Sequence, residues 1–401
     1  MIHQAIAPAM QSEEMPQDDA GFLAVVRAFF DHALTPDLRK AGRETLGTHS
    51  DIEACKVWHR RLYERGWIAP AWPVAFGGTG WSARQRFLFD RECARQDAPV
   101  LFIGGIRSLG PLLIEQGTPE QRARFLTPML SGRDLWCQGF SEPGAGSDLA
   151  AISTRAVRDG DSYVVNGSKI WTTGAHHANW MFAIVRTDDS GKRQQGLTFL
   201  LIDMTSPGLS VKPIIGLAGD HEFNQVFFDD VRVPVAQRIG AENDGWTMAK
   251  RLMQLARSNN TPAALVGRVL RRTLEAVAAA GDTVEPSVRT HLAGLLVELE
   301  AFEQLELSGF AAGPVRPGDQ ALPSMLKLTG SELHQRVAEL AMEVAGPQAA
   351  ATLEALDLAG EELDVGAKAT AKHLCVRAAT VYSGTSETQR NVIAHQILAS
   401  R

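Results

Sequence analysis

The spacing of hydrophobic residues changes twice along the chain, and this change limits the folds that the sequence can adopt. From residue 20 to about 130, apolar residues recur at every third or fourth position, which is the period of an amphipathic helix. One helix is expected from Ala20 to Leu34, and a second from Asp51 to Arg65, ending at Gly66. Ser82 can cap a third helix. The first 130 residues are therefore predicted to be helical.

From about 131 to 235 the period falls to two, which is typical of β-strands. Short runs rich in β-branched or aromatic residues are separated by turn signals such as Asp159-Gly160 and Asn166-Gly167. The expected strands cover 153–157, 163–165, 181–185, 197–202 and 225–228. Strands of this length and spacing favour a compact β-barrel or sandwich over βαβ units.

After about 240 the helical period returns and persists to the end of the chain. Long helices are expected over 246–255, 263–279, 288–310, 324–344 and 367–382, with apolar stripes of Leu and Ala as in a four-helix bundle. The predicted fold class is α+β. The expected domains are an N-terminal helical domain over 1–130, a middle β-barrel domain over 131–240 and a C-terminal four-helix bundle over 241–401.

Composition excludes several classes of protein. The formal net charge is −6, with 40 Lys+Arg against 46 Asp+Glu, whereas nucleic-acid binders usually present a basic face. The four cysteines form no Cys-x-x-Cys pair, so neither a zinc site nor a disulfide framework is indicated. No apolar run approaches the ~18 residues that span a bilayer, and the N-terminal residues do not form a signal peptide. We expect a cytoplasmic protein that binds no metal, nucleic acid or membrane.

The segment 138–148 is rich in glycine and hydroxyl residues. It is not a dinucleotide fingerprint, because the third glycine and a βαβ unit are missing. One interpretation is a tight surface loop. The other is that its small residues let the backbone approach a planar or anionic ligand, with Ser141 and Ser147 as donors.

Two further segments combine aromatic and hydroxyl residues. In 166–175, Trp171 is either a core residue or a shelf for a ring with polar edges, and the adjacent Thr172 and Thr173 suit the second interpretation. The segment 381–391 contains Tyr-Ser-Gly-Thr-Ser-Glu-Thr-Gln-Arg. Its simplest interpretation is a connector between helices in which Ser386 is an N-cap and Gln389 completes a capping box.

At these three segments together the sequence resembles the acyl-CoA dehydrogenase flavoprotein family. The likeness also includes 73–80, 231–234 and 240–246, so it covers nearly the whole chain. The order of a helical domain, a β-domain and a four-helix bundle is also that of the family. The resemblance implies that FAD lies between the β-domain and the bundle, in a site completed by a second subunit.

The resemblance implies a role for each matching residue. It places Gln138, Phe140, Ser141, Ser147, Trp171 and Thr173 at the flavin ring, and Thr385 and Glu387 near the ADP moiety of FAD. It places Ser147, Arg257, Ser383 and Gly384 at the acyl-CoA substrate. The flavin carries the redox chemistry, and the protein holds and orients it.

The sequence departs from the family at the catalytic base. The family removes the α-proton of a thioester with a glutamate while the β-hydride goes to flavin N5. In short- and medium-chain members this glutamate directly precedes the Gly-Thr of the tail motif, where this chain has Ser383. A serine hydroxyl is far too weak a base, although its backbone N–H can still donate to the thioester oxygen. Other branches place the glutamate directly before an arginine, and here that pair is Ala256-Arg257. Both usual base positions therefore lack a carboxylate, and the identity of the base stays open.

A second departure concerns the segments that reach the FAD of a neighbouring subunit. A polar loop at 281–287 replaces the Arg-x-x-Phe-Gly segment of the family, and Pro347 removes a backbone donor from a stretch that usually wraps FAD. This pattern resembles the large subunit of heteromeric acyl-CoA dehydrogenases, in which one chain can supply the base for another. Those α2β2 assemblies act on steroid side-chain or dicarboxylic acyl-CoA thioesters.

Three functions stay open at this point. The first is an acyl-CoA dehydrogenase subunit in a homo- or heterotetramer, with electron-transfer flavoprotein as its acceptor. The second is a flavin-dependent oxygenase or oxidase on the same fold, and the third is a non-catalytic scaffold subunit. Three further groups are minor candidates. Asp244 could replace the base, and Arg268, Arg271 and Arg272 either contact the phosphates of CoA or form a solvated helix face. His176 and His177 resemble a metal-binding pair but lack a third ligand at useful spacing.

Overall fold

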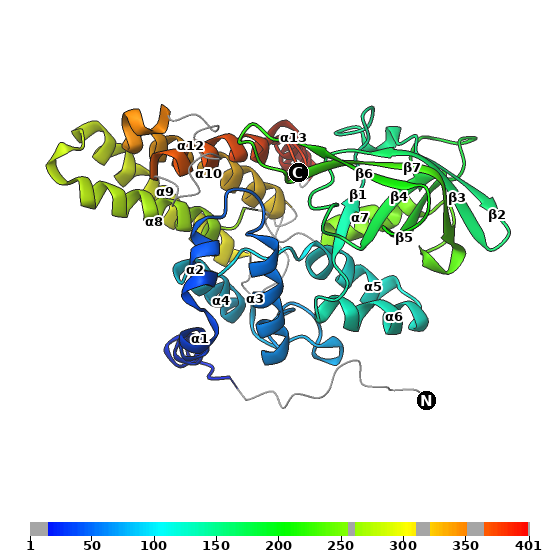
Figure 1. Cartoon of the computed structure of the whole chain (residues 1–401), viewed down its shortest axis with the longest axis horizontal. Coiled ribbons are helices and arrows are strands. Elements are labelled where there is room, and N and C mark those ends of the chain that lie inside the picture. Colours follow the sequence, from blue (N-terminus) through cyan, green and yellow to red (C-terminus); the bar gives the residue numbers. More distant parts are fainter. Residues whose placement is uncertain (1–14, 256–260, 310–320, 351–364, 400–401) are drawn as a thin grey trace.

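The computed structural model describes residues 15–255, 261–309, 321–350 and 365–399. Helices come first, a β-sheet follows, and a second group of helices completes the chain (Figure 1). The predicted α+β fold class is therefore confirmed.

The first group of helices surrounds an aromatic core. Its α-helices are α1 (Asp19–Ala33), α2 (Pro36–Arg43), α3 (Ile52–Arg65), α4 (Ala83–Arg95), α5 (Gly110–Gln116) and α6 (Pro119–Leu130). α3 ends at Gly66, which has a left-handed backbone, and α4 begins with a capping box between Ser82 and Gln85, so both predicted helix signals are confirmed. Phe22, Phe30 and Trp58 are fully buried where these helices pack together.

The eight strands form one sheet in the order β6-β7-β3-β2-β4-β5-β8, with β1 paired in parallel to β4. The strands are β1 (Trp136–Gly139), β2 (Arg155–Asp159), β3 (Ser162–Lys169), β4 (Trp180–Arg186), β5 (Leu197–Asp203), β6 (Leu209–Ile214), β7 (Phe223–Pro234) and β8 (Arg238–Ile239). β5 and β7 are not neighbours in this order, yet they contact each other, so the sheet curls into a barrel-like shape. Side chains of both strands, including Leu200 and Val226, share one buried core.

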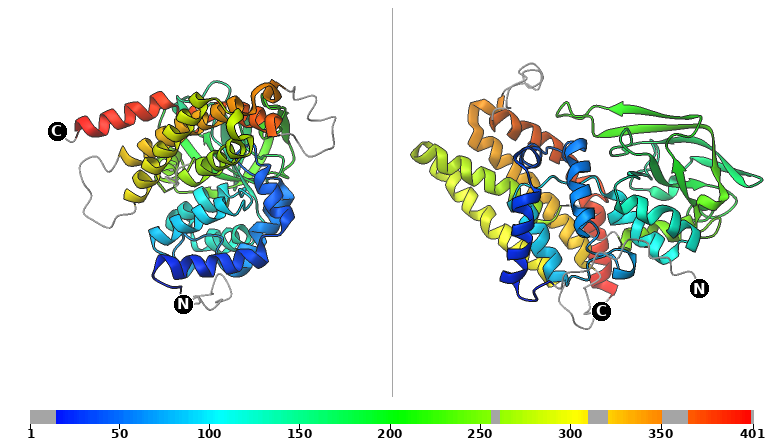
Figure 2. Two further views of the ribbon diagram at one scale, coloured as in Figure 1. Left: turned by 90° about the vertical axis from the view of Figure 1, so that its left-hand side faces the viewer. Right: turned by 60° about the horizontal axis from the view of Figure 1, so that its bottom comes forward.

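The second group of helices forms a bundle beside the sheet (Figures 1 and 2). Its α-helices are α7 (Gly245–Leu255), α8 (Ala263–Ala280), α9 (Pro286–Ser308), α10 (Leu322–Ala345), α12 (Val365–Val376) and α13 (Ser386–Ala399). α10 lies at its centre and contacts α8, α9, α12 and α13. α13 projects away from the bundle (Figure 2). No helix within the four described ranges is both long and apolar enough to cross a membrane.

The helix expected over 367–382 ends earlier than predicted. α12 stops at Val376, and a short 3-10 helix, Arg377–Thr380, replaces its last turn. The Gln335 amide of α10 donates to the carbonyl oxygens of Val376 and Arg377, each at 3.1 Å. A side chain of a neighbouring helix therefore bonds the carbonyl groups at the end of α12.

The capping predicted at the start of the last helix is also wrong. Ser386 is already the first helical residue, and the Thr385 hydroxyl accepts the N–H of Thr388 at 3.2 Å. The Gln389 amide donates to the carbonyl oxygens of Ser383 at 3.1 Å and Gly384 at 3.4 Å instead of completing a capping box. The cap of α13 is therefore Thr385.

Candidate functional site

The segments 138–148 and 166–175 lie side by side. The Ile170 N–H donates to the Ser141 carbonyl at 2.9 Å, and the Lys169 ammonium donates to a Glu142 carboxylate oxygen at 2.7 Å. Burial alone raises the pKa of Glu142, but the Lys169 charge and its hydrogen bonds outweigh burial and hold that pKa below its usual range. The two segments are therefore joined by backbone and by charge.

Trp171 protrudes from the place where these segments meet. Its side chain is 59% exposed, and its ring makes an edge contact with Phe223 at 6.2 Å between centroids. Its φ of 59° is a left-handed conformation, which is strained for any residue other than glycine. The interpretation of Trp171 as a core residue is wrong, because its side chain is exposed and therefore does not contribute to a core.

The turn that carries Trp171 is fixed to the start of β7. The Thr172 N–H donates to the Asn224 carbonyl at 3.0 Å, and the Asn224 side-chain amide donates back to the Thr172 carbonyl at 3.1 Å. The Gly174 N–H donates to the Glu222 carbonyl at 2.8 Å. The buried Thr172 hydroxyl has no hydrogen-bond partner within the described part of the chain. This turn is therefore rigid but still has an unused polar group.

The tail motif approaches the same place through the loop before β7. The Cys375 thiol of α12 contacts an Asp220 carboxylate oxygen at 3.8 Å. Burial, and after it the Glu222 charge, raises the pKa of Tyr382 to about 12, so Glu222 lies near the tail as well as under the Trp171 turn. Ser383, the next residue, is exposed and has a φ of 55°. Tyr382 of the tail motif and the Trp171 turn therefore both lie near Glu222, while the segment 138–148 is joined to this place through its bonds to Lys169 and Ile170.

The remaining candidate residues differ in what they expose. Gln138, Ser147 and Glu387 are exposed, whereas Ser141, Thr173, Gly384 and Thr385 are half-buried. Phe140 is 5% exposed, its ring packs at the edges of Phe182 and Phe199, and its carbonyl accepts the Lys169 ammonium at 3.3 Å. Ala256 and Arg257 lie outside the described residues.

The residues present fit a flavin. An isoalloxazine needs an apolar surface for its face and hydrogen-bonding groups for its edges. Here the exposed Trp171 indole supplies the surface. Thr173 and the unpartnered Thr172 hydroxyl follow it in the chain, and Ser141 is bonded to the residue before it, Ile170. This set of groups suits a planar ring better than a single anion.

Four histidines lie beside the same turn, and two of them, His49 and His221, were not predicted from the sequence. His221 stacks on His176 with 3.8 Å between ring centroids, His177 is 3.9 Å from His176, and His49 is 6.1 Å from His177. Stacked rings do not direct their nitrogens at one point, and no metal-binding group of three or more ligands occurs among the described residues. Burial, and after it the neighbouring imidazoles, lowers the pKa of His176 to about 4.

The three arginines of α8 serve the fold. Arg268 is buried and donates to the carbonyl oxygens of Gly42 at 3.2 Å and Ala98 at 2.9 Å. Arg271 and Arg272 both donate to Asp97, at 2.8 and 3.2 Å. The prediction of a solvated helix face is wrong, because these side chains join α8 to the first group of helices. These same bonds occupy the guanidinium groups that were candidates for CoA phosphates.

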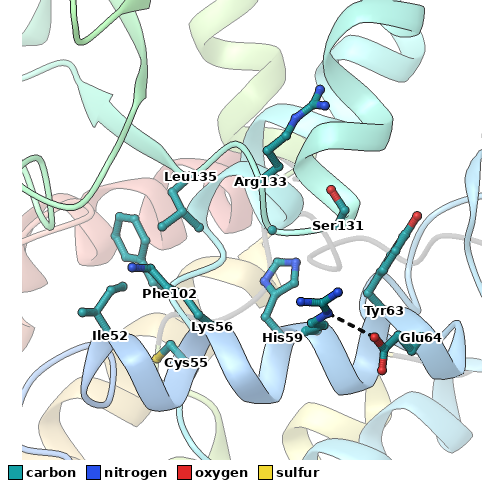
Figure 3. Close-up of a pocket in the computed structure, with 12 residues that line it drawn as sticks. Ile52, Cys55, Lys56, His59, Tyr63, Glu64, Phe102, Ser131, Arg133 and Leu135 are labelled. Atoms are coloured by element: carbon teal, nitrogen blue, oxygen red, sulfur yellow. Dashed lines mark hydrogen bonds and ion pairs between the residues drawn. The ribbon is translucent and has the colours of Figure 1, made fainter.

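A separate cavity of about 400 Å³ lies along α3 (Figure 3). Cys55, His59 and Phe102 line it together with the basic side chains of Lys56 and Arg133. None of its lining residues belongs to the three motif segments. The Phe102 ring also packs closely against Gly174, so it separates this cavity from the Trp171 turn.

Three domain models of one protein family match most of the chain. The N-terminal, middle and C-terminal domains of acyl-CoA dehydrogenase match residues 16–133, 137–231 and 243–398. The chain therefore belongs to the acyl-CoA dehydrogenase family, whose members are FAD-dependent oxidoreductases that act on CH–CH groups.

Individual members of the family are similar to this chain over nearly its full length. The acyl-CoA dehydrogenase IpdE1 of Mycobacterium tuberculosis is 36% identical over 392 residues, which cover 95% of this chain and 98% of IpdE1. A chain of the ChsE4-ChsE5 complex from Mycobacterium tuberculosis has a TM-score of 0.81 at 30% identity and covers 96% of this chain and 97% of its own. A chain described as Tcur3481-Tcur3483 steroid ACAD also has a TM-score of 0.81, at 29% identity, and covers 97% of this chain and 99% of its own.

Proposed function

We propose that this chain is the FAD-binding subunit of an acyl-CoA dehydrogenase that introduces an α,β double bond into an acyl-CoA thioester beside a related, base-bearing chain. One observation carries the proposal. The Trp171 turn forms an exposed shelf next to Ser141, whereas the tail motif has Ser383 where short- and medium-chain members of the family have a glutamate.

Each residue then has a defined task. A bound FAD would supply the acceptor for the hydride that leaves the substrate β-carbon. Trp171 would pack against its ring, and Ser141 and Thr173 would hydrogen-bond the ring edges. The Ser383 N–H donates to the thioester oxygen and stabilises the negative charge that develops when the α-proton leaves. The Ser383 hydroxyl cannot remove that proton, because its basicity is far too low.

The relatives support a particular kind of partner and of acyl group. Two structural neighbours are named as pairs of chains, which supports a heteromeric assembly. One of them is named as a steroid acyl-CoA dehydrogenase, which supports a bulky, steroid-derived acyl group. We propose an assembly of the α2β2 type with electron-transfer flavoprotein as the electron acceptor.

The test compares the chain alone with the chain co-expressed with a related, glutamate-bearing partner. Both preparations are mixed anaerobically with a steroid side-chain acyl-CoA and with butyryl-CoA, and bleaching of the flavin absorbance is followed. We expect rapid bleaching by the steroid thioester in the complex and weak flavination or slow reduction in the isolated chain. Fast dehydrogenation of butyryl-CoA or octanoyl-CoA by the pure isolated chain contradicts the proposal.

A second candidate function rests on the same vacant base position. A flavin-dependent oxygenase or oxidase whose reaction does not involve loss of an α-proton, such as an N- or C-hydroxylation, does not need a carboxylate at this position. Oxygen consumption by the reduced flavoprotein, without bleaching by any acyl-CoA, favours this function. A complex that stays colourless with added FAD instead supports a scaffold role.

A further inference from the structure

A completely buried ion pair lies behind the exposed Trp171 turn. The Lys169 ammonium is 2.7 Å from a Glu142 oxygen, and the two side chains are 0% and 3% exposed. Removing two charges from water costs several kcal/mol for each ion, so such a pair persists only with good geometry and further hydrogen bonds. Neither residue is among the groups expected to contact the flavin or the substrate.

The remaining hydrogen-bonding capacity of Glu142 is used by the segment before β2. One carboxylate oxygen accepts the Ser153 N–H at 2.7 Å and the Ser153 hydroxyl at 2.8 Å. The other oxygen accepts the Thr154 N–H at 3.0 Å. Glu142 therefore joins the segment 138–148, called here the flavin loop, to the hairpin of β2 and β3.

Lys169 makes corresponding bonds to the other side of the sheet. Its ammonium donates to the Ile184 carbonyl of β4 at 2.7 Å and to the Phe140 carbonyl at 3.3 Å. The next residue, Ile170, donates its N–H to the Ser141 carbonyl at 2.9 Å. Lys169 thus fixes the distance between the loop that carries Ser141 and the strand that leads to Trp171.

This attachment explains how Trp171 keeps a strained backbone. A left-handed backbone at a residue other than glycine is strained and persists only where the surrounding structure holds it in place. Ile170 fixes the N-terminal side of Trp171 through Ser141, and Thr172 fixes the C-terminal side through Asn224. The indole is therefore held in solvent before any ligand binds.

We propose that Glu142 and Lys169 are positioning residues of the flavin site, which act through each other to hold the Ser141 loop and the Trp171 shelf at the separation that an isoalloxazine needs. This inference rests on the proposed function. The Glu142–Lys169 pair would then determine the affinity for FAD and the surroundings of the isoalloxazine, in addition to stabilising the fold.

The main test removes both charges. The double variant Glu142→Gln/Lys169→Met leaves no uncompensated buried charge, and neutral replacement of a buried pair is often tolerated by the fold. FAD is titrated into the protein in its assembly with the partner chain, and the dissociation constant, the absorption spectrum of bound flavin and the melting temperature are measured. We expect the dissociation constant to rise on the order of tenfold, with a shifted flavin spectrum, because a small misplacement of positioned groups weakens binding and alignment together.

The single variants test whether the two residues act through each other. Glu142→Gln and Lys169→Met each leave one buried charge unpaired, so each lowers the melting temperature more than the double variant does. In a double-mutant cycle we expect strong non-additivity in FAD affinity, with the double variant no worse than the poorer single variant. Additive effects overturn the proposal.

Two controls separate positioning from general stability. Glu92→Gln breaks the Arg27–Glu92 pair, whose carboxylate is 3% exposed but lies among the first helices, and Arg193→Gln breaks the exposed Arg193–Asp148 pair on the flavin loop. We expect both variants to keep the parent FAD affinity and spectrum, whatever their melting temperatures. If the double variant behaves like these controls, the inference fails. If the parent protein itself binds no FAD, the proposed function fails instead.

Discussion

The Trp171 turn and the Ser383 tail are two parts of one candidate site, but the structure holds them differently. Each contains a left-handed residue that is not glycine, with φ of 59° and 55°. The Trp171 turn is fixed by bonds from residues far away in sequence, including Ser141 and Asn224. In the Ser383 tail, the Gln389 amide donates to the carbonyl oxygens of Ser383 and Gly384, and Arg390 pairs with Glu332 of α10, so these bonds lie within the tail or go to a helix rather than to the sheet.

This difference separates two functions of the site. Groups that would orient a planar cofactor are built into the sheet, so their loss would disturb several strands at once. The base position precedes a helix that projects from the bundle (Figure 2), and the residue there is exposed. A substitution such as the serine at 383 therefore leaves the sheet unchanged. A chain can keep the shelf and lose the base.

The largest expected effect comes from restoring a base. Ala256→Glu places a carboxylate directly before Arg257, the arrangement of family branches with bulky substrates. General-base catalysis typically contributes about 10²–10⁴-fold, so we expect the rate of flavin reduction by acyl-CoA to rise by about that range in the isolated, FAD-loaded chain. Stopped-flow absorbance of the flavin measures the rate.

Ser383→Glu is the matched comparison. Its glutamate would occupy the sequence position that straight-chain branches use, but the backbone of this chain is left-handed there, with φ of 55°. Because a left-handed backbone strains a glutamate, we expect a smaller gain. If the Ala256→Glu protein binds acyl-CoA yet reduces its flavin no faster than the parent, the dehydrogenase geometry is wrong. The oxygenase function then becomes the leading one.

The second prediction compares a glycine from each region. A Cβ on Gly167 of β3, where φ is 137°, would lie 2.8 Å from the Thr154 backbone, whereas a Cβ on Gly384 would meet the movable end of Gln389 at 2.4 Å. We expect Gly167→Ala to lower the free energy of unfolding by about 1–3 kcal/mol and Gly384→Ala by about 1 kcal/mol. Denaturant titration measures both values, and equal losses would show that the two regions are equally rigid.

The sequence predicted those elements whose signal lies within the element. Helices such as α3 and α4 have caps and apolar stripes of their own, and β4 and β5 are mostly apolar runs. β1 has only four residues and depends on parallel pairing with β4, while β6 contains Lys212 and Pro213. These strands escaped prediction because distant partners, rather than local periodicity, determine them.

The candidate site shows the same limit. Motif order identified Ser141, Trp171 and the tail segment, but not the strain at Trp171, since a left-handed tryptophan has no sequence signature. The approach of His221 to His176 depends on how β7 meets the turn, over 45 residues away in sequence. The end of α12 is likewise set by Gln335 of another helix.

The third prediction concerns the shelf itself. Because Trp171 is 59% exposed, Trp171→Ala leaves no buried cavity, and we expect the melting temperature to stay near that of the parent. Stacking of a flat heterocycle on an aromatic side chain is worth about 1–3 kcal/mol, so FAD affinity should fall about tenfold. Fluorescence titration with FAD measures the affinity. Trp180→Ala is the control for stability. Because it removes a buried indole, we expect it to lower the melting temperature clearly.

The smallest expected effect is a pH dependence of the Trp171 turn. Asn224 donates its side-chain amide both to the Thr172 carbonyl and to His176 Nδ1 at 3.0 Å, so His176 must keep a lone pair there. Its folded pKa is about 4 against an ordinary value of 6.5, so between these values the unfolded chain binds more protons than the folded one. The contribution of His176 to the free energy of unfolding is therefore fully present above pH 6.5 and falls as the pH drops towards 4.

The variant His176→Gln tests this dependence, because glutamine keeps an acceptor but does not titrate. We expect its free energy of unfolding, measured by denaturant titration at several pH values, to fall less over this range than that of the parent. The exposed His395→Gln should follow the parent curve, and parallel curves for all three proteins would exclude His176 from this role.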